Sequence, residues 1–181
     1  MIEIEAANVV PAPVEEVFAF LSALENHWAV AGRWVKVVSL DADARGGRVR
    51  IHGPLGLRRT VTTRVEATES PKSIRGSATL GTTRAEVSWT LAPRAAGGTE
   101  VRLAAAVLRA GALDRALLAL GAARWMRSLF AATLRRLAPA MAQPAPAPHR
   151  AAVRQLSSRL RTLPVALRGS SSRNSTSRGT L

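Results

Sequence analysis

Hydrophobic and polar residues alternate along the first ten positions of the chain. The residues that share one face of this segment are Ile2, Ile4, Ala6, Asn8 and Val10. The opposite face carries Glu3 and Glu5. This period of two predicts a half-buried β-strand over residues 2–10, with Asn8 on its inward face.

The pattern changes to a helical period after Pro13. Apolar residues from Val14 to Leu21 recur at three- to four-residue spacing, which predicts a short amphipathic helix whose first turn tolerates the missing N–H of proline. A second short helix is predicted over residues 25–32, because Gly32 is suited to end it. The chain therefore begins with a strand and two short helices.

Alternating segments separated by turns of hairpin length follow. The predicted strands cover residues 33–40, 48–53, 57–67, 73–80, 82–92 and 99–108. With the first strand they make seven, and the short turns favour antiparallel pairing. Trp89 falls on an apolar face of its strand, whereas Arg59 and Thr63 share a face with apolar neighbours.

A long helix is predicted from residue 112 to just before Pro139, because proline disfavours a helix interior. The small residues on the first half of its apolar face are Ala119, Ala122 and Ala123. Larger side chains, beginning with Met126, follow on the second half. We therefore expect a cavity beneath the first half and a packed core beneath the second.

The order of these elements resembles that of the START/polyketide-cyclase-like helix-grip superfamily, also called SRPBCC, over about residues 1–139. The segments that carry the resemblance are PAPVEEVFAFL (11–21), HW (27–28), GPLGLRRTVTTRVEA (53–67), AEVSWTLAP (85–93) and GGTEVRLAA (97–105). The resemblance implies an α+β helix-grip fold, with a curved seven-stranded antiparallel sheet wrapped around a long C-terminal helix. It also implies a cavity for a small hydrophobic ligand.

Composition adds a boundary near residue 140. The chain has 181 residues, 47% of them hydrophobic, and a net charge of +14. Residues 140–181 contain seven arginines and no acidic residue, so they carry half of the net charge. We expect a ligand-binding domain over residues 1–139 and a disordered tail, rich in Pro, Ala and Arg, over residues 140–181.

Several classes of partner are not expected. Basic and aromatic residues do not interleave in the domain, so no specific nucleic-acid partner is predicted, whereas the tail is compatible with weak contact with an anionic membrane. The chain has no cysteine and three histidines without an acidic cluster, so neither a metal site nor a cofactor is predicted. No signal peptide or membrane span is recognised, and we expect a cytoplasmic protein.

The candidate ligand-binding residues are those assigned to the cleft: Asn8, Trp28, Arg59, Thr63, Trp89, Ala119, Ala122, Ala123 and Met126. Arg59 would hold a ligand oxygen or carboxylate, unless the twist of its strand turns it to solvent. His27 is the candidate catalytic residue, as a general acid or base. A structural histidine is the alternative, because no carboxylate partner for it is evident.

Three functions remain open at this stage. The first is binding of a small hydrophobic molecule, such as a lipid, a polyketide or an isoprenoid-like compound. The second is a cyclase- or dehydratase-type enzyme on the same fold, against which the absence of tyrosine counts. The third is a membrane-associated accessory protein, because GPLG (53–56), GTEV (98–101) and the final helix are similar to those of accessory proteins of carbon monoxide dehydrogenase.

Overall fold

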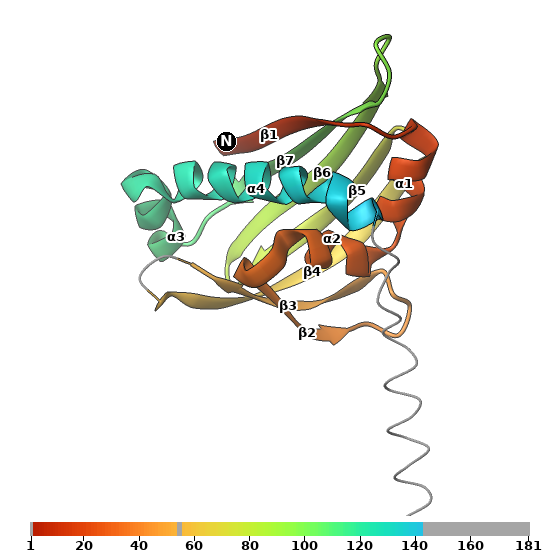
Figure 1. Cartoon of the computed structure of the whole chain (residues 1–181). Helices are drawn as coiled ribbons and strands as arrows, with labels where there is room; N and C mark the ends of the chain where they lie inside the picture. Colours follow the sequence, from red (N-terminus) through yellow and green to blue (C-terminus); the bar gives the residue numbers. More distant parts are fainter. Residues whose placement is uncertain (1, 54–55, 143–181) are drawn as a thin grey trace, which may run out of the picture. The chain divides into compact units, whose positions relative to one another are not determined.

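The computed structural model describes residues 2–53 and 56–142, in which a curved sheet packs around a long helical segment (Figure 1). The strands are β1 (Ile2–Val10), β2 (Val35–Leu40), β3 (Gly46–His52), β4 (Arg58–Glu69), β5 (Ser73–Leu80), β6 (Thr83–Pro93) and β7 (Thr99–Arg109). The helices are α1 (Val14–Ser22), α2 (Leu24–Ala31), α3 (Ala112–Leu117) and α4 (Ala123–Ala142). Most of the predicted tail lies outside the described residues.

All seven strands belong to one antiparallel sheet, in the order β1-β7-β6-β5-β4-β3-β2. Every neighbouring pair except β1 and β7 joins consecutive strands, which is the arrangement that short turns favour. Register shifts leave an extra residue in β2, β4 and β7, and such bulges bend strands. The predicted helix-grip architecture, with its two short helices after β1, is thus confirmed.

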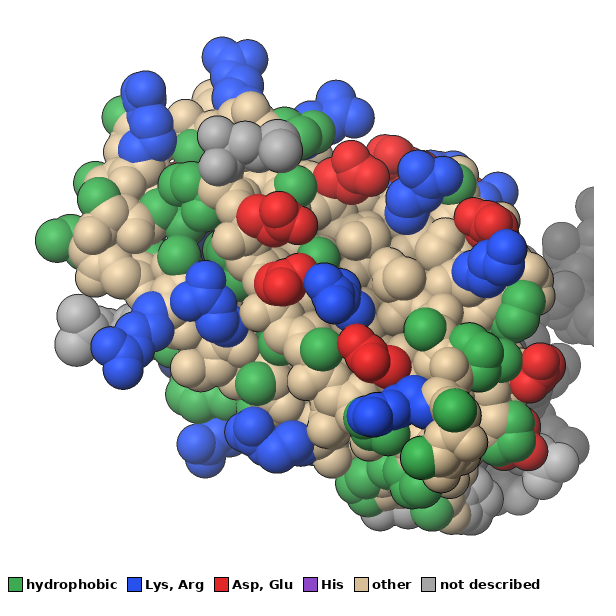
Figure 2. Space-filling model, turned by 90° about the horizontal axis from the view of Figure 1, so that it is seen from above, with side chains coloured by type: hydrophobic (Ala, Val, Ile, Leu, Met, Phe, Trp, Pro, Cys, Tyr) green, Lys and Arg blue, Asp and Glu red, His purple; other side chains and the backbone are tan. Residues whose placement is uncertain are grey.

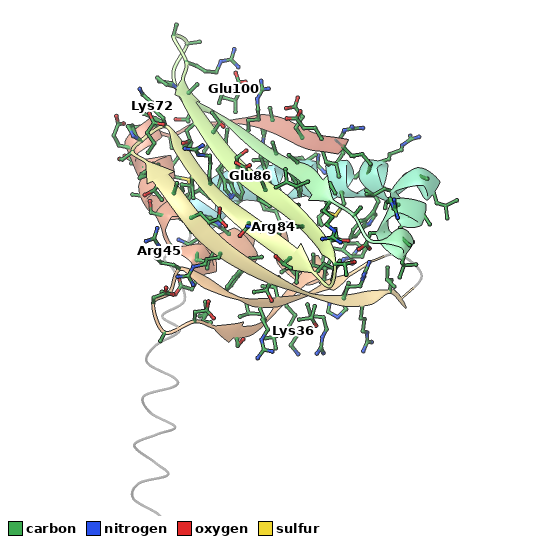
Figure 3. All side chains as sticks on the ribbon, turned by 180° about the vertical axis from the view of Figure 1, so that it is seen from behind. Lys36, Arg45, Lys72, Arg84, Glu86 and Glu100 are labelled. Carbon is green, nitrogen blue, oxygen red and sulfur yellow. The ribbon has the colours of Figure 1, made fainter. Side chains whose placement is uncertain are left out.

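The two faces of the sheet differ in character. The concave face is turned toward α4 and is apolar, as the alternation along the strands predicts (Figure 1). The other face carries charged side chains, among them Arg84 and Glu86 of β6 (Figure 3). Of the helices described, none has the length and hydropathy that crossing a membrane requires.

The C-terminal helical segment is not the uniform helix that the sequence predicts. A wide turn of π-helical type at Leu118–Ala122 separates α3 from α4. Within this turn Gly121 has a φ of 102°, a backbone conformation that residues with a side chain rarely adopt. The segment therefore bends at Gly121, and the faces of α3 and α4 do not form one continuous stripe.

The prediction that this helix ends before Pro139 is wrong, because α4 continues to Ala142. Pro139 removes one backbone donor from the helix. However, Ala138, Ala140 and Met141 beside it pack against the main core. Burial of these side chains outweighs the lost hydrogen bond and keeps the last turn helical.

The main core lies beneath the second half of α4. Leu134 and Leu137 are fully buried there, together with Val10 of β1 and with Val17 and Leu21 of α1. This packing fixes the helix against the N-terminal end of the chain. The predicted core beneath the later part of the helix is confirmed.

A smaller core forms where α2 meets the sheet. Trp28 packs there against Val49 of β3 and Val61 of β4. The close approach depends on Gly47, where a Cβ would lie 2.9 Å from Cη2 of Trp28 and 2.5 Å from the carbonyl oxygen of Ser39. Glycine at this position thus allows the indole ring to lie directly on β3.

Gly47→Ala is expected to lower the free energy of unfolding by about 1–3 kcal/mol, because the added methyl group overlaps the Ser39 carbonyl and the Trp28 ring. Chemical denaturation of both proteins measures the difference. Gly53→Ala is the matched control, since a Cβ there makes only an ordinary contact of 3.5 Å with Leu57. Equal losses in the two variants would show that the close packing at Gly47 is not the cause.

Candidate functional site

A cavity of about 400 Å³ lies between the concave face of the sheet and the helical segment. Its wall consists mostly of apolar side chains, and it extends along the helical segment from Asp114 to Thr133. A cavity therefore exists beneath the first half of the predicted helix, but it also extends beneath the second half as far as Thr133, where only a packed core was expected. Its size and lining suit a small hydrophobic molecule.

Small residues on the sheet contribute to this space. Ala78 of β5 and Ala85 of β6 are directly paired, and both line the cavity, as does Ala105 of β7. A larger apolar residue at any of these positions would extend into the cavity. The sequence thus leaves room on the concave face, where other strand positions carry Val, Ile or Trp.

The cavity brings together six of the candidate ligand-binding residues: Trp28, Arg59, Thr63, Trp89, Ala122 and Met126. Three other candidates, Asn8, Ala119 and Ala123, do not line it. The amide of Asn8 instead donates to the carbonyl oxygen of Leu134, at 3.4 Å, and so joins β1 to α4 at the packed end. Whether the six bind a ligand stays a prediction.

The prediction misplaces Ala119 and Ala123 because the wide turn at Leu118–Ala122 breaks the helical register. Ala119 is exposed, and Ala123 packs on the main core. The residues that face the cavity in their place are Leu117 and Leu118, just before the bend. A regular step of 100° per residue along the whole segment could not have placed them.

A polar network forms the α3 end of the cavity. Nη1 of Arg59 donates to Oδ1 of Asp114, and Nη2 of Arg59 lies 3.5 Å from Oδ2. The hydroxyl of Thr83 donates to Oδ2 of Asp114 and accepts the backbone N–H of Gly111 at 3.0 Å. Both Arg59 and Asp114 are part of the cavity wall.

The Arg59 side chain is only 24% exposed, so the alternative that strand twist turns it to solvent is wrong. It is also not a free cation, because the carboxylate of Asp114 neutralises it. An arginine in this state offers N–H donors rather than net positive charge. It is therefore better suited to a neutral polar group than to a carboxylate.

Thr63 supplies a second polar group in the cavity. It lies four residues beyond Arg59 on the same face of β4, about 13 Å along the strand. Its hydroxyl is buried, and no hydrogen-bond partner for it exists among the residues described. A buried hydroxyl without a partner costs free energy.

His27 of α2 lies in the cavity wall, with its ring centroid 5.3 Å from that of Trp89. Its Nε2 donates to the carbonyl oxygen of Leu21, so Nδ1 is unprotonated in the neutral ring. Burial lowers the pKa of His27 below its ordinary value, although the Leu21 hydrogen bond and the charge of Glu25 partly oppose this. The ring is therefore a fixed, neutral imidazole, and no carboxylate of the described chain hydrogen-bonds to it.

Comparison with known families identifies this fold. The family of polyketide cyclase/dehydrase and lipid transport proteins matches residues 1–142. The chain belongs to this family. The match includes β1 through α4, and therefore every element that lines the cavity. No functionally curated protein matches the chain.

Solved structures with the same fold come from several bacteria. A protein from Thermus thermophilus is 20% identical, with a TM-score of 0.57, over 77% of this chain and 97% of its own. One from Rhodobacter sphaeroides is 27% identical, with a TM-score of 0.53, over 77% and 91%. One from Chromobacterium violaceum is 20% identical, with a TM-score of 0.53, over 78% and 99%. These likenesses support the fold and leave the ligand open.

Asp114 is the site residue that sequence reasoning missed. It lies in the first turn of α3 and is buried by its contacts with Arg59 and Thr83. One signal could have pointed to it, because Asp114 is the only acidic residue after Glu100. A single acid among many arginines suggests a specific partner.

Among residues 2–53 and 56–142, no group of side chains suitable for a metal ion occurs.

The buried state of His27 predicts a pH dependence of stability. Its pKa is lower in the folded protein than in the unfolded chain, so the unfolded chain binds the proton more readily. The stabilisation is fully present above about pH 6.5, and it is lost as the pH falls from there through the folded-state pKa.

We expect the free energy of unfolding to decrease between about pH 7 and pH 5 more steeply in the wild-type protein than in His27→Gln. The glutamine amide can still donate a hydrogen bond to Leu21 but does not titrate. Urea denaturation at several pH values measures both slopes. Parallel slopes would mean that His27 is not the group responsible.

Proposed function

We propose that the protein binds a small, mainly hydrophobic molecule in the cavity, with one polar ligand atom hydrogen-bonded to Thr63. The observation that carries this proposal is a cavity of about 400 Å³ with a mostly apolar wall, in which the buried hydroxyl of Thr63 has no partner among the described residues. Transfer of an apolar ligand from water to such a wall is favourable in proportion to the area buried. The hydroxyl adds orientation, since a ligand without a matching polar atom leaves it unpaired.

The charge state of the cavity favours a neutral ligand. Arg59 is neutralised by Asp114, and burial keeps His27 uncharged near neutral pH. A ligand carboxylate would therefore meet no uncompensated positive charge from either of these groups. Alcohols, ketones and esters on a lipid, polyketide or isoprenoid-like skeleton fit this environment better than acids do.

The spacing of the polar groups favours an elongated ligand. Thr63 and Arg59 are about 13 Å apart along β4, and the wall between them is apolar. Asp114 uses two of the five N–H donors of Arg59, so other donors remain for a second ligand oxygen. A molecule with an apolar body and a polar group near each end would satisfy both positions.

Binding is better supported than catalysis on this wall. General acid–base chemistry needs a proton donor and a proton acceptor placed on the reacting atoms. Nε2 of His27 is already engaged by Leu21, and the carboxylate of Asp114 by Arg59 and Thr83. Only Nδ1 of His27 is left as a proton acceptor, and no carboxylate of the described chain hydrogen-bonds to that ring.

Ala85→Phe is expected to weaken binding of the neutral fluorophore N-phenyl-1-naphthylamine at least about tenfold, because the phenyl ring takes up cavity space. Fluorescence titration measures the dissociation constant, and thermal unfolding checks that the variant is folded. Ala92→Phe on the exposed face of the same strand is the matched control and should bind as wild type does. Equal affinity of all three proteins would place the fluorophore outside the cavity and refute the proposed site.

Thr63→Val tests the polar contact separately. Valine has nearly the shape of threonine and removes the unpartnered hydroxyl, so we expect the ligand-free protein to be as stable or more stable. Affinity for a long-chain alcohol should fall several-fold, whereas affinity for the alkane of equal length should not fall. Isothermal titration with both ligands gives the comparison. A parallel loss for alcohol and alkane would contradict the assigned role of the hydroxyl.

A further inference from the structure

Exposed leucines gather at the end of the molecule that contains α3. We define the α3 surface as Leu57, Leu108, Leu113 and Leu120 together with Arg58, Arg84, Arg109, Arg115 and Arg124. The strand register brings those at the strand ends, Arg58, Arg84, Leu108 and Arg109, to one end of the sheet, because β4 and β6 begin where β7 finishes. The contact between Arg59 and Asp114 joins α3 to the start of β4.

The exposure of these leucines is unusual for a surface in water. Leu120 is 84% exposed, Leu113 60% and Leu108 55%, which are the highest values for any large hydrophobic residue described. Single exposed leucines are common, but a cluster at one end of a protein indicates an interaction site. The bend at Gly121 contributes directly, since Leu120 lies in the turn that it creates.

The charge of the α3 surface has one sign. Its five arginines are exposed, and no described carboxylate lies within ion-pair distance of any of them. The one acidic residue of α3, Asp114, is taken by Arg59 on the cavity side. In Figure 2 the end that holds α3 in Figure 1 shows basic and hydrophobic side chains, and the acidic side chains lie elsewhere.

We propose that the α3 surface docks on an anionic lipid bilayer. The leucines would enter the region between head groups and acyl chains, while the arginines would contact lipid phosphates. A nucleic acid would satisfy the arginines but not the leucines. A bilayer satisfies both, and it needs no shape complementarity to leucines that come from separate elements.

The α3 surface adjoins the cavity. Leu57 belongs to both, and Leu117 and Leu118 face the cavity from the other side of the helical segment. Docking would therefore bring the α3 end of the cavity to the lipid, where an apolar ligand could be exchanged without crossing water. Only this exchange rests on the proposed function, because the docking itself is inferred from the exposed leucines and arginines of the α3 surface.

A site-specific fluorophore can detect docking, because the chain contains no cysteine. Leu120→Cys in the full-length protein, labelled with an environment-sensitive dye, should show a blue shift with vesicles of phosphatidylglycerol and phosphatidylcholine. Val38→Cys on β2, where the valine is 46% exposed, is the control and should show none. Both proteins keep the basic tail, so binding through the tail alone would leave Leu120→Cys unshifted and overturn the proposal.

Charge reversal gives an independent test. Arg115→Glu/Arg124→Glu should reduce partition into these vesicles at least about 30-fold, since the loss of each basic residue near an anionic surface costs about fivefold and the added glutamates are repelled as well. Arg75→Glu/Arg94→Glu changes the net charge equally on exposed residues outside the α3 surface and should have a small effect. Equal losses would indicate unspecific electrostatic attraction and refute docking through this surface, as would a lack of vesicle binding by every protein.

Docking on vesicles and ligand binding in the cavity can be tested separately in one variant. Ala85→Phe alters the cavity and leaves the α3 surface unchanged, so it should lose the hydrophobic fluorophore but retain vesicle binding. Loss of vesicle binding in Ala85→Phe would contradict the assignment to the surface. Retained fluorophore binding in Ala85→Phe would refute the cavity while leaving the docking result valid.

Discussion

A helix packed against a strongly curved sheet touches the sheet over only part of its length, and the rest of this structure depends on that constraint. The second half of α4 makes the close contact, where Leu134 and Leu137 are fully buried. Between the sheet and the part of the helical segment from Asp114 to Thr133 lies the cavity. The core and the cavity are thus two results of one packing arrangement.

The α3 end of the cavity needs contacts of its own with the sheet, because a helical segment held at one end only would be free to move at the other. Asp114 supplies it: its carboxylate binds Arg59 of β4 and Thr83 of β6, and so ties α3 to two strands. The bend at Gly121 allows α3 to leave the axis of α4 and reach this position. The same bend places Leu120 in water, so closure of the cavity and exposure of the leucine have a common cause.

The sequence is sufficient to predict elements whose side chains alternate or repeat regularly. Trp89 and Thr63 can be assigned to the concave face because β-strands place successive side chains on opposite faces, and the cavity lining agrees. Ala119 is misplaced by the same reasoning because a single wide turn changes the helical phase, and the glycine that permits it has no periodic signature. Asn8 faces inward as expected, but it contacts the packed end of α4.

The partner of Arg59 cannot be derived from periodicity either, because Asp114 is 55 residues away along the chain. A contact of this kind follows from the tertiary path of the chain. The sign of its charge is the available clue, since no other acid occurs between Glu100 and the C-terminus. The sequence therefore contains the two halves of the network and lacks the geometry that joins them.

The position of Asp114 determines which arginines near the α3 end have their charge compensated. Arg59, which faces the cavity, has a carboxylate partner, and its charge is neutralised where a low dielectric would make it costly. The arginines of the α3 surface have no such partner among the described residues, and they lie where water or lipid head groups can solvate them. An uncompensated charge in the cavity would favour acidic ligands, whereas the same charge outside favours an anionic surface. A single aspartate thus compensates the arginine that faces the cavity and leaves the arginines of the α3 surface uncompensated among the described residues.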